Sequence, residues 1–126
     1  MKYLLDSNII IYHLNGDESA TEFILSNLND CAISQITYIE VLSFDFEEND
    51  FFDVKELLEY FNVIDISKGI AVQCLKNRKI KKIKIPDNLI ASTAQVNDLV
   101  LVTANTDDFK RIDVKTLNIL KKDQSL

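Results

Sequence analysis

Short apolar segments alternate with amphipathic ones along this chain, and this alternation restricts the folds that it can form. The segments KYLL at 2–5 and LVLVT at 99–103 are typical of short strands buried on both faces of a sheet. Strands that alternate with helices usually pack as a parallel sheet between two helical layers. The sequence therefore predicts an α/β fold, a three-layer α/β/α sandwich around a central, mainly parallel sheet.

The expected element boundaries follow from apolar periodicity and from helix-capping residues. Strands are expected at residues 2–5, 31–33, 63–66, 99–103 and, weakly, 117–120. Helices are expected at residues 7–14, from Asp17 onward, at 36–44 behind a Ser34 cap, at 53–61, at 68–79 and from Pro86 to 97, with a helical turn at 107–111. Proline fits the start of a helix because its missing N–H has no intrahelical acceptor there.

Length and composition are those of one compact domain. With 126 residues, 47% of them hydrophobic, and only 2 glycines and 1 proline, we expect a single domain over 1–126. No apolar run approaches the roughly 20 residues that span a membrane, and Asp6 interrupts the N-terminal run in a way that a signal peptide would not tolerate. We therefore expect a cytoplasmic protein without membrane association. In that reducing compartment, Cys31 and Cys74 are expected to be buried thiols.

Charge is distributed unevenly along the chain. The net charge of −6 does not favour phosphate partners, and seven acids lie at 45–59. Residues 76–84, in contrast, contain no acid and six of the fourteen basic side chains: Lys76, Arg78, Lys79, Lys81, Lys82 and Lys84. This basic run leads directly to Asp87 and is a candidate RNA-binding patch. A solvated helix end, whose lysines complement the helix dipole, explains the run equally well.

Acidic residues stand at the junctions of the most apolar segments. Asp6 follows the first strand and Asp108 lies beyond the strand at 99–103, so both fall at the edge where parallel strands end. Asp87 stands in the first turn of a helix. Each of these three also has a structural explanation, as a helix cap, a partner of the helix dipole or a turn residue.

Glu40 is harder to explain by local structure. Apolar side chains occupy nearly the whole circumference of its helix, and only Thr37, Glu40 and Ser43 form a narrow polar stripe. We therefore expect Glu40 to point into an enclosed polar site. A buried ion pair with a distant lysine is the alternative.

The four acids Asp6, Glu40, Asp87 and Asp108 together are typical of a metal site. Hard oxygen ligands without nearby histidine or cysteine favour Mg²⁺ or Mn²⁺, and such ions promote phosphodiester hydrolysis. Ser7, Asn8, Thr103 and Asn105 are polar neighbours that could orient the acids or hold a phosphate. The single histidine, His13, is expected to have a core or surface role, and no residues suggest triad chemistry.

Four motifs resemble those of the PIN-domain ribonucleases, and among them the VapC-type toxins of bacterial and archaeal toxin–antitoxin pairs. They are LLDSNIIIY, SQITYIEVLSF, IPDNLIASTA and LVTANTDDF, in this order along the chain. The resemblance extends from Lys2 to about Leu120. It implies a Mg²⁺- or Mn²⁺-dependent endoribonuclease that acts on tRNA or ribosomal RNA, forms a homodimer and is silenced by a cognate antitoxin.

The resemblance also implies roles for individual residues. Asp6, Glu40, Asp87 and Asp108 would bind the metal, Asn8 and Thr37 would support them, and Thr103 and Asn105 would belong to the fourth motif. Two positions depart from the family pattern. Ala104 stands where arginine is common, and Asp107 beside Asp108 leaves two candidates for the fourth ligand, of which we favour Asp108 because it directly precedes Phe109.

Three other functions remain to be considered. A phosphatase of the haloacid dehalogenase type would need a second acid where Asn8 stands, and a response-regulator receiver would need a lysine after a late strand, which 99–105 lacks. A catalytically silent PIN-fold binding module would be expected to have lost some acids. Phe44, Phe46, Phe51 and Phe52 form either an interaction surface or a loop that packs back onto the core.

Overall fold

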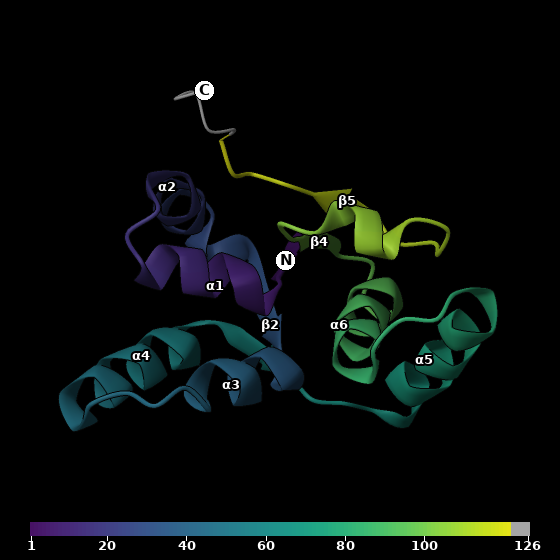
Figure 1. Ribbon diagram of the computed structural model, residues 1–126, viewed down its shortest axis with the longest axis horizontal. Coiled ribbons are helices and arrows are strands. Elements are labelled where there is room, and N and C mark those ends of the chain that lie inside the picture. Colours follow the sequence, from purple (N-terminus) through teal and green to yellow (C-terminus); the bar gives the residue numbers. More distant parts are fainter. Residues whose placement is uncertain (122–126) are drawn as a thin grey trace.

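A computed structural model describes residues 1–121 of the chain (Figure 1). The strands are β1 (Tyr3–Leu5), β2 (Cys31–Ser34), β3 (Asn62–Ile64), β4 (Val100–Val102) and β5 (Thr116–Leu117). The α-helices are α1 (Ser7–Leu14), α2 (Glu18–Ser26), α3 (Gln35–Leu42), α4 (Glu48–Tyr60), α5 (Lys68–Ile80) and α6 (Ile85–Val96). Two short 3₁₀ helices, η1 (Leu28–Asp30) and η2 (Thr106–Phe109), complete the described elements.

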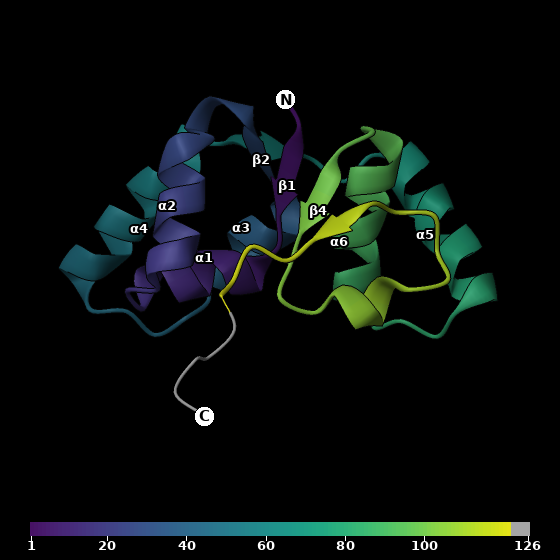
Figure 2. The same cartoon turned by 90° about the horizontal axis from the view of Figure 1, so that it is seen from above.

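The five strands form one sheet in the order β3-β2-β1-β4-β5, and every neighbouring pair is parallel. Figure 2 shows α2 and α4 on one side of this sheet and α5 and α6 on the other. The predicted α/β sandwich is therefore confirmed, with a sheet that is entirely parallel. The expectation that 1–126 form one domain stays a prediction.

The strand order reverses between β1 and β4. From β1 the chain proceeds outward to β2 and β3, and it then returns past the first strand to β4 and β5. Such a switch point opens a crevice at the carboxyl ends of the two central strands. Asp6 follows β1 and Thr103 follows β4 at this place, and the Asp6 N–H donates to the Val102 carbonyl at 2.9 Å. The fold itself therefore directs Asp6 toward the crevice.

Alternate strand residues face the two helical layers, as the pleat of a strand requires. Leu5, Ile33 and Val102 pack in one buried cluster with residues of α1, α2 and α4. Leu4, Ala32 and Leu101 pack in a second cluster with residues of α6. Two apolar layers thus fix the sheet, and only its strand ends are left for polar chemistry.

A buried polar network joins α5 to α6. The Asn77 side-chain amide donates to Asn88 Oδ1 at 3.0 Å, to Ser92 Oγ at 3.1 Å and to Gln95 Oε1 at 2.7 Å. The Asn88 amide in turn donates to the Cys74 carbonyl at 3.0 Å. Asn88, Ser92 and Gln95 share one face of α6 by helical spacing. Because each group needs its partners once buried, the network fixes how α6 sits against α5.

The predicted boundaries differ most at α4. The expected helix began at residue 53, but α4 begins at Glu48, five residues earlier. Glu48 and Asp50 lie in its first turn, where carboxylates favour the helix dipole, so the helix extends beyond its apolar stripe. The last strand is also shorter than expected, with only Thr116–Leu117 paired to β4 instead of 117–120.

Other expectations about burial are met in part. Cys31 and Cys74 are both buried free thiols, as predicted. Phe46 packs against the core, whereas Phe44 and Phe52 are exposed, and an interaction surface formed by these two stays a prediction. Within residues 1–121, no helix combines the length and apolar character that crossing a membrane requires.

Replacing Asn77 with alanine should lower the free energy of unfolding by about 2–3 kcal/mol, because the replacement leaves several buried polar groups without partners. Lys76→Ala, at the exposed neighbouring position, is the matched control and should change it by less than about 0.5 kcal/mol. Urea unfolding followed by circular dichroism measures both. Equal effects for the two variants would show that the network does not hold the helix pair.

Candidate functional site

Asp6 occupies the turn between β1 and α1, where it caps the helix. Its Oδ1 accepts from the Ser7 backbone N–H at 2.7 Å, and its Oδ2 accepts from the Thr103 hydroxyl at 2.8 Å. Its side chain is almost fully buried, with 6% of the residue exposed. The predicted capping role is therefore correct. The second carboxylate oxygen, however, binds Thr103 directly after β4 rather than the helix.

The environment of Asp6 disfavours its charge. Burial raises the pKa of Asp6 to about 6, and the nearby Asp87 and Glu40 carboxylates add to the rise, although the hydrogen bonds from Thr103 and Ser7 oppose it. Burial likewise raises the pKa of Asp87, with further contributions from Glu40 and Asp108, while Lys84 acts in the opposite direction. The four acids proposed from the sequence thus act on one another electrostatically.

Asn8 and Thr103 connect α1 to the segment after β4. The Asn8 side-chain amide lies 3.4 Å from both Asp6 Oδ2 and Thr103 Oγ1, and Asn8 Oδ1 accepts from the Ala104 N–H at 3.2 Å. The Asn105 N–H donates to Thr103 Oγ1 at 3.1 Å, whereas the Asn105 side chain is exposed. Asn105 therefore contributes through its backbone.

Ser7 connects α1 to α3. Its hydroxyl donates to Glu40 Oε1 at 2.7 Å and lies 3.1 Å from the buried Thr37 Oγ1. Glu40 thereby faces the crevice, but it is exposed, so the expectation of an enclosed site around it is wrong. The reason is that Ile39 and Phe44 are also exposed, and the apolar circumference of this helix is not all buried. The alternative, a buried ion pair, is excluded by the exposure of Glu40.

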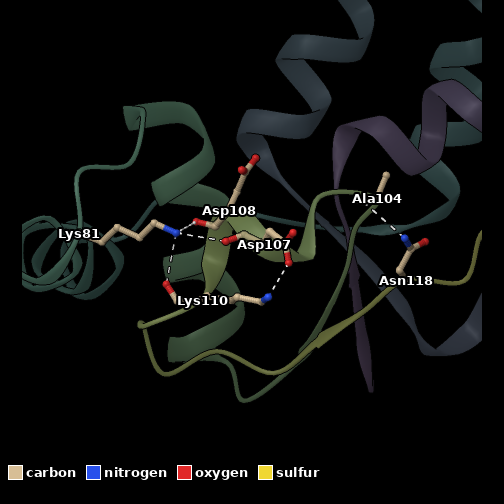
Figure 3. A network of polar contacts seen from close by, with 6 residues as sticks. All are labelled: Lys81, Ala104, Asp107, Asp108, Lys110 and Asn118. Atoms are coloured by element: carbon tan, nitrogen blue, oxygen red, sulfur yellow. Dashed lines mark hydrogen bonds and ion pairs between the residues drawn. The ribbon is translucent and has the colours of Figure 1, made fainter.

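Asp87 and Asp108 lie close to each other, on α6 and on η2. Asp87 is half-buried in the first turn of α6, and Asp108 is exposed on η2. Both line a hollow of about 320 Å³ together with Lys82 and Lys84. Asp107 instead forms an ion pair with Lys110 at 2.8 Å, and Figure 3 shows its side chain turned away from that of Asp108. Of the two candidates for the fourth ligand, Asp108 is the one beside Asp87.

The basic run divides into two groups. Arg78 donates to the Ile83 carbonyl at 3.0 Å, and Lys81 donates to backbone carbonyls of the η2 region, so both have partners within the protein. Lys82 and Lys84 line the hollow with Asp87, as does Lys81, while Lys76 and Lys79 are exposed on α5. The sequence alone placed all six in one class, because spacing does not reveal which lysine reaches a carbonyl.

His13 has the structural role expected of it. Its Nδ1 lies 2.7 Å from Thr21 Oγ1, and it thereby joins α1 to α2. Partial burial lowers its pKa. It takes no part in the group of acids.

The acids fit a divalent cation by their chemistry. Asp6, Glu40, Asp87 and Asp108 offer only oxygen atoms, which suits Mg²⁺ or Mn²⁺. Within residues 1–121, none of the four has an ion-pair partner, and their repulsion would be relieved by a cation. In the same range, no three His, Cys, Asp or Glu side chains are already gathered into a metal-ligand cluster. Ion binding would therefore have to draw them together.

Comparison with known proteins identifies the class of fold and site. The family model for the PIN domain matches residues 3–115, and the chain therefore belongs to the PIN-domain family. A chain of a toxin–antitoxin complex from Klebsiella pneumoniae is 31% identical, with a TM-score of 0.80, over 96% of this chain and 100% of that one. A chain of DNA-bound VapBC from Salmonella typhimurium is 26% identical, with a TM-score of 0.80, over 93% of this chain and 97% of that one. A chain of VapBC2 from Rickettsia felis, bound to a promoter DNA fragment, is also 26% identical, with a TM-score of 0.77, over 94% of this chain and 98% of that one. The resemblance to VapC-type proteins is confirmed; a comparison with curated proteins found no match.

Asp6→Asn should stabilise the metal-free protein above about pH 6. The native carboxyl keeps its proton up to about pH 6, whereas the carboxyl of the unfolded chain releases its proton near 3.8, so between these values the native state binds more protons. The contribution of Asp6 to the free energy of unfolding therefore falls as the pH rises through this window, by up to roughly 3 kcal/mol.

Urea unfolding in EDTA at several pH values measures this effect. The gain of Asp6→Asn over wild type should grow between about pH 4 and pH 7 and then level off. Asp65→Asn, at an exposed position after the edge strand β3, should show no such growth. If Asp6→Asn raises the free energy of unfolding by the same amount at every pH, ionisation of Asp6 is not what destabilises the wild-type protein.

Proposed function

We propose that this protein is a Mg²⁺- or Mn²⁺-dependent endoribonuclease and the toxin of a type II toxin–antitoxin pair. The observation that carries the proposal is the group of acids at the switch point, without ion-pair partners within residues 1–121 and with the pKa of buried Asp6 raised to about 6. Such a group disfavours its own charge, and a bound cation reverses that preference. Membership in the PIN-domain family supports nuclease activity as its use.

Asp6, Glu40 and Asp87 would hold the principal ion, with Asp108 supporting it or a second one. A bound divalent ion supplies charge neutralisation at the scissile phosphate and lowers the pKa of an attacking water. The residues of the chain prepare this site. Thr103 and the Ser7 backbone fix both oxygens of Asp6, and the Ser7 hydroxyl fixes one oxygen of Glu40, so two acids are oriented before any ion arrives.

The RNA strand would approach over the hollow beside Asp87. Lys82 and Lys84 line it together with Asp87 and Asp108, so their ammonium groups can bind phosphates next to the acids. The exposed Lys76 and Lys79 would extend this basic surface along α5. This local patch compensates for the net charge of −6 and for Ala104 in the fourth motif.

The relatives suggest the partners. Solved structures similar to this chain are toxin–antitoxin complexes, two of them bound to DNA. We therefore propose a cognate antitoxin for this protein, a homodimeric state, and action on tRNA or ribosomal RNA in the cytoplasm. A hollow of about 430 Å³ with Ile11, Leu14, Phe44 and Phe46 in its walls offers an apolar surface on which a partner can dock.

Two alternatives are less well supported. A silent binding module has no need for buried Asp6, whose ionised form is costly to keep. A haloacid dehalogenase-type phosphatase would require an acid at position 8, but Asn8 there is engaged by the Ala104 N–H. An assay for RNA cleavage separates the proposed nuclease from both alternatives.

The purified protein should cleave a tRNA or ribosomal RNA mixture with Mn²⁺ and lose this activity in EDTA. Asp6→Asn and Asp87→Asn should each reduce the rate by more than about 100-fold, since even residues that only orient metal ligands cost about 10- to 100-fold. Gel electrophoresis of end-labelled RNA measures the rates.

Asp107→Asn and Asp108→Asn provide a matched pair on the same turn. Only Asp108→Asn should slow cleavage, because Asp108 lines the hollow with Asp87, whereas Asp107 is paired with Lys110 and its side chain is turned away from that of Asp108. Undiminished cleavage by Asp6→Asn would contradict the proposed function, and a slower Asp107→Asn with a normal Asp108→Asn would move the fourth ligand to Asp107.

A further inference from the structure

We infer that Lys81 is a positioning residue that holds the η2 turn, and with it Asp108, against the part of the molecule that carries Asp87. The inference rests on the proposed function for the role of Asp108. It assigns to Lys81 a task different from that of its neighbours Lys82 and Lys84, although all three belong to one basic run. Lys81 would act through Asp108 rather than on RNA or metal.

The Lys81 ammonium is fully occupied by backbone carbonyls. Nζ donates to the carbonyls of Asp107 at 3.2 Å, Asp108 at 2.8 Å and Lys110 at 3.3 Å (Figure 3). An ammonium has three donors, and each has an acceptor here. Lys81 therefore has no free donor for a phosphate, and it joins three carbonyls of the segment 107–110 that includes Asp108.

The carbonyls that accept from Lys81 lie in and just after the short helix η2. Carbonyls at the end of a short helix lack intrahelical partners, and a cation near that end is favoured by the dipole. Of the three carbonyls, that of Asp107 also accepts from the Lys110 backbone N–H, at 3.3 Å. The Lys110 ammonium is turned to the Asp107 side chain at 2.8 Å. The cation that satisfies these carbonyls thus comes from Lys81, across 26 to 29 residues of sequence.

A path of hydrogen bonds continues from Lys81 to the helix of Asp87. The Lys81 N–H donates to the Asn77 carbonyl at 2.9 Å, at the end of α5. The Asn77 side chain donates to Asn88 Oδ1 at 3.0 Å, and Asn88 is adjacent to Asp87 on α6. Asp87 and Asp108, which come from separate segments, are in this way tied to one anchor. The Asp108 carboxylate contributes to the raised pKa of Asp87, as expected for two acids that lie close together.

Lys81→Met removes the three donors and keeps the length of the side chain. Its first readout is amide hydrogen exchange in the metal-free protein. The Asp108 N–H, which donates to the Asn105 carbonyl at 3.1 Å, and the Lys110 N–H should exchange about 10-fold faster or more once the turn is released. Lys82→Met, the matched control on the adjacent residue, should leave these two amides unchanged.

The second readout separates positioning from RNA contact. Lys81→Met should raise the Mn²⁺ concentration for half-maximal cleavage by about 10-fold, the usual cost of losing a group that orients a metal ligand. It should not alter the salt dependence of RNA binding. Lys82→Met should keep the Mn²⁺ midpoint and reduce the salt slope by about one, as expected for a lost phosphate contact. Lys81→Arg, which keeps charge and donors, should restore most of the Mn²⁺ affinity, which a purely structural loss would not predict.

The inference is overturned if Lys81→Met leaves the exchange of Asp108 and Lys110 unchanged, or if it reduces the salt slope and not the Mn²⁺ affinity. If methionine prevents folding, Lys81→Gln is measured in the same way, because its amide keeps two of the three donors and should show a smaller effect in the same direction. A wild-type protein that neither binds Mn²⁺ nor cleaves RNA would contradict the proposed function alone. The exchange measurement needs neither metal nor RNA, so it decides the role of Lys81 separately.

Discussion

The buried carboxylate of Asp6 at the switch point of the sheet is the constraint on which the rest of the site depends. The strand order places β1 beside β4, and the Thr103 hydroxyl and the Ser7 N–H then fix both oxygens of Asp6. Burial without an ion-pair partner raises its pKa to about 6, so the charged form is kept at a cost near neutral pH. A bound cation would stabilise the charged form, and this is why we propose that the group serves a metal site.

The site is assembled in two halves. In one half, Ser7 and Asn8 join α1 to Glu40 on α3 and to the segment after β4. In the other half, Lys81 and Asn77 tie the turn of Asp108 to the helix of Asp87. The segment from Asn105 to Asp108 joins the two halves, with the Asp108 N–H donating to the Asn105 carbonyl at 3.1 Å, while the carboxylates of the halves repel one another. A divalent cation would replace this repulsion with attraction.

The sequence contained enough information for the layers of the fold and for the proximity of the four acids. Continuous apolar strands implied a parallel sheet, and acids at strand ends implied a shared edge, because both signals are local and periodic. Exposure of Glu40 was not predictable, since the sequence does not show that Ile39 and Phe44 on its helix also remain exposed. The carbonyl clamp of Lys81 was missed because a lysine's partners depend on tertiary contacts. The polar face of Asn88, Ser92 and Gln95 on α6 was a readable signal of the buried network that was not used.

The most direct test of the central claim is thermal unfolding of the wild-type protein in a Mn²⁺ titration at several pH values. A cation that completes the group of acids should raise the melting temperature in proportion to the logarithm of its concentration once binding is saturated. The effect should strengthen as the pH rises through about 6, where Asp6 loses its proton, and it should be much smaller in Asp6→Asn. A melting temperature that does not respond to Mn²⁺, or that responds equally in Asp6→Asn, would contradict the claim that these acids form a metal site.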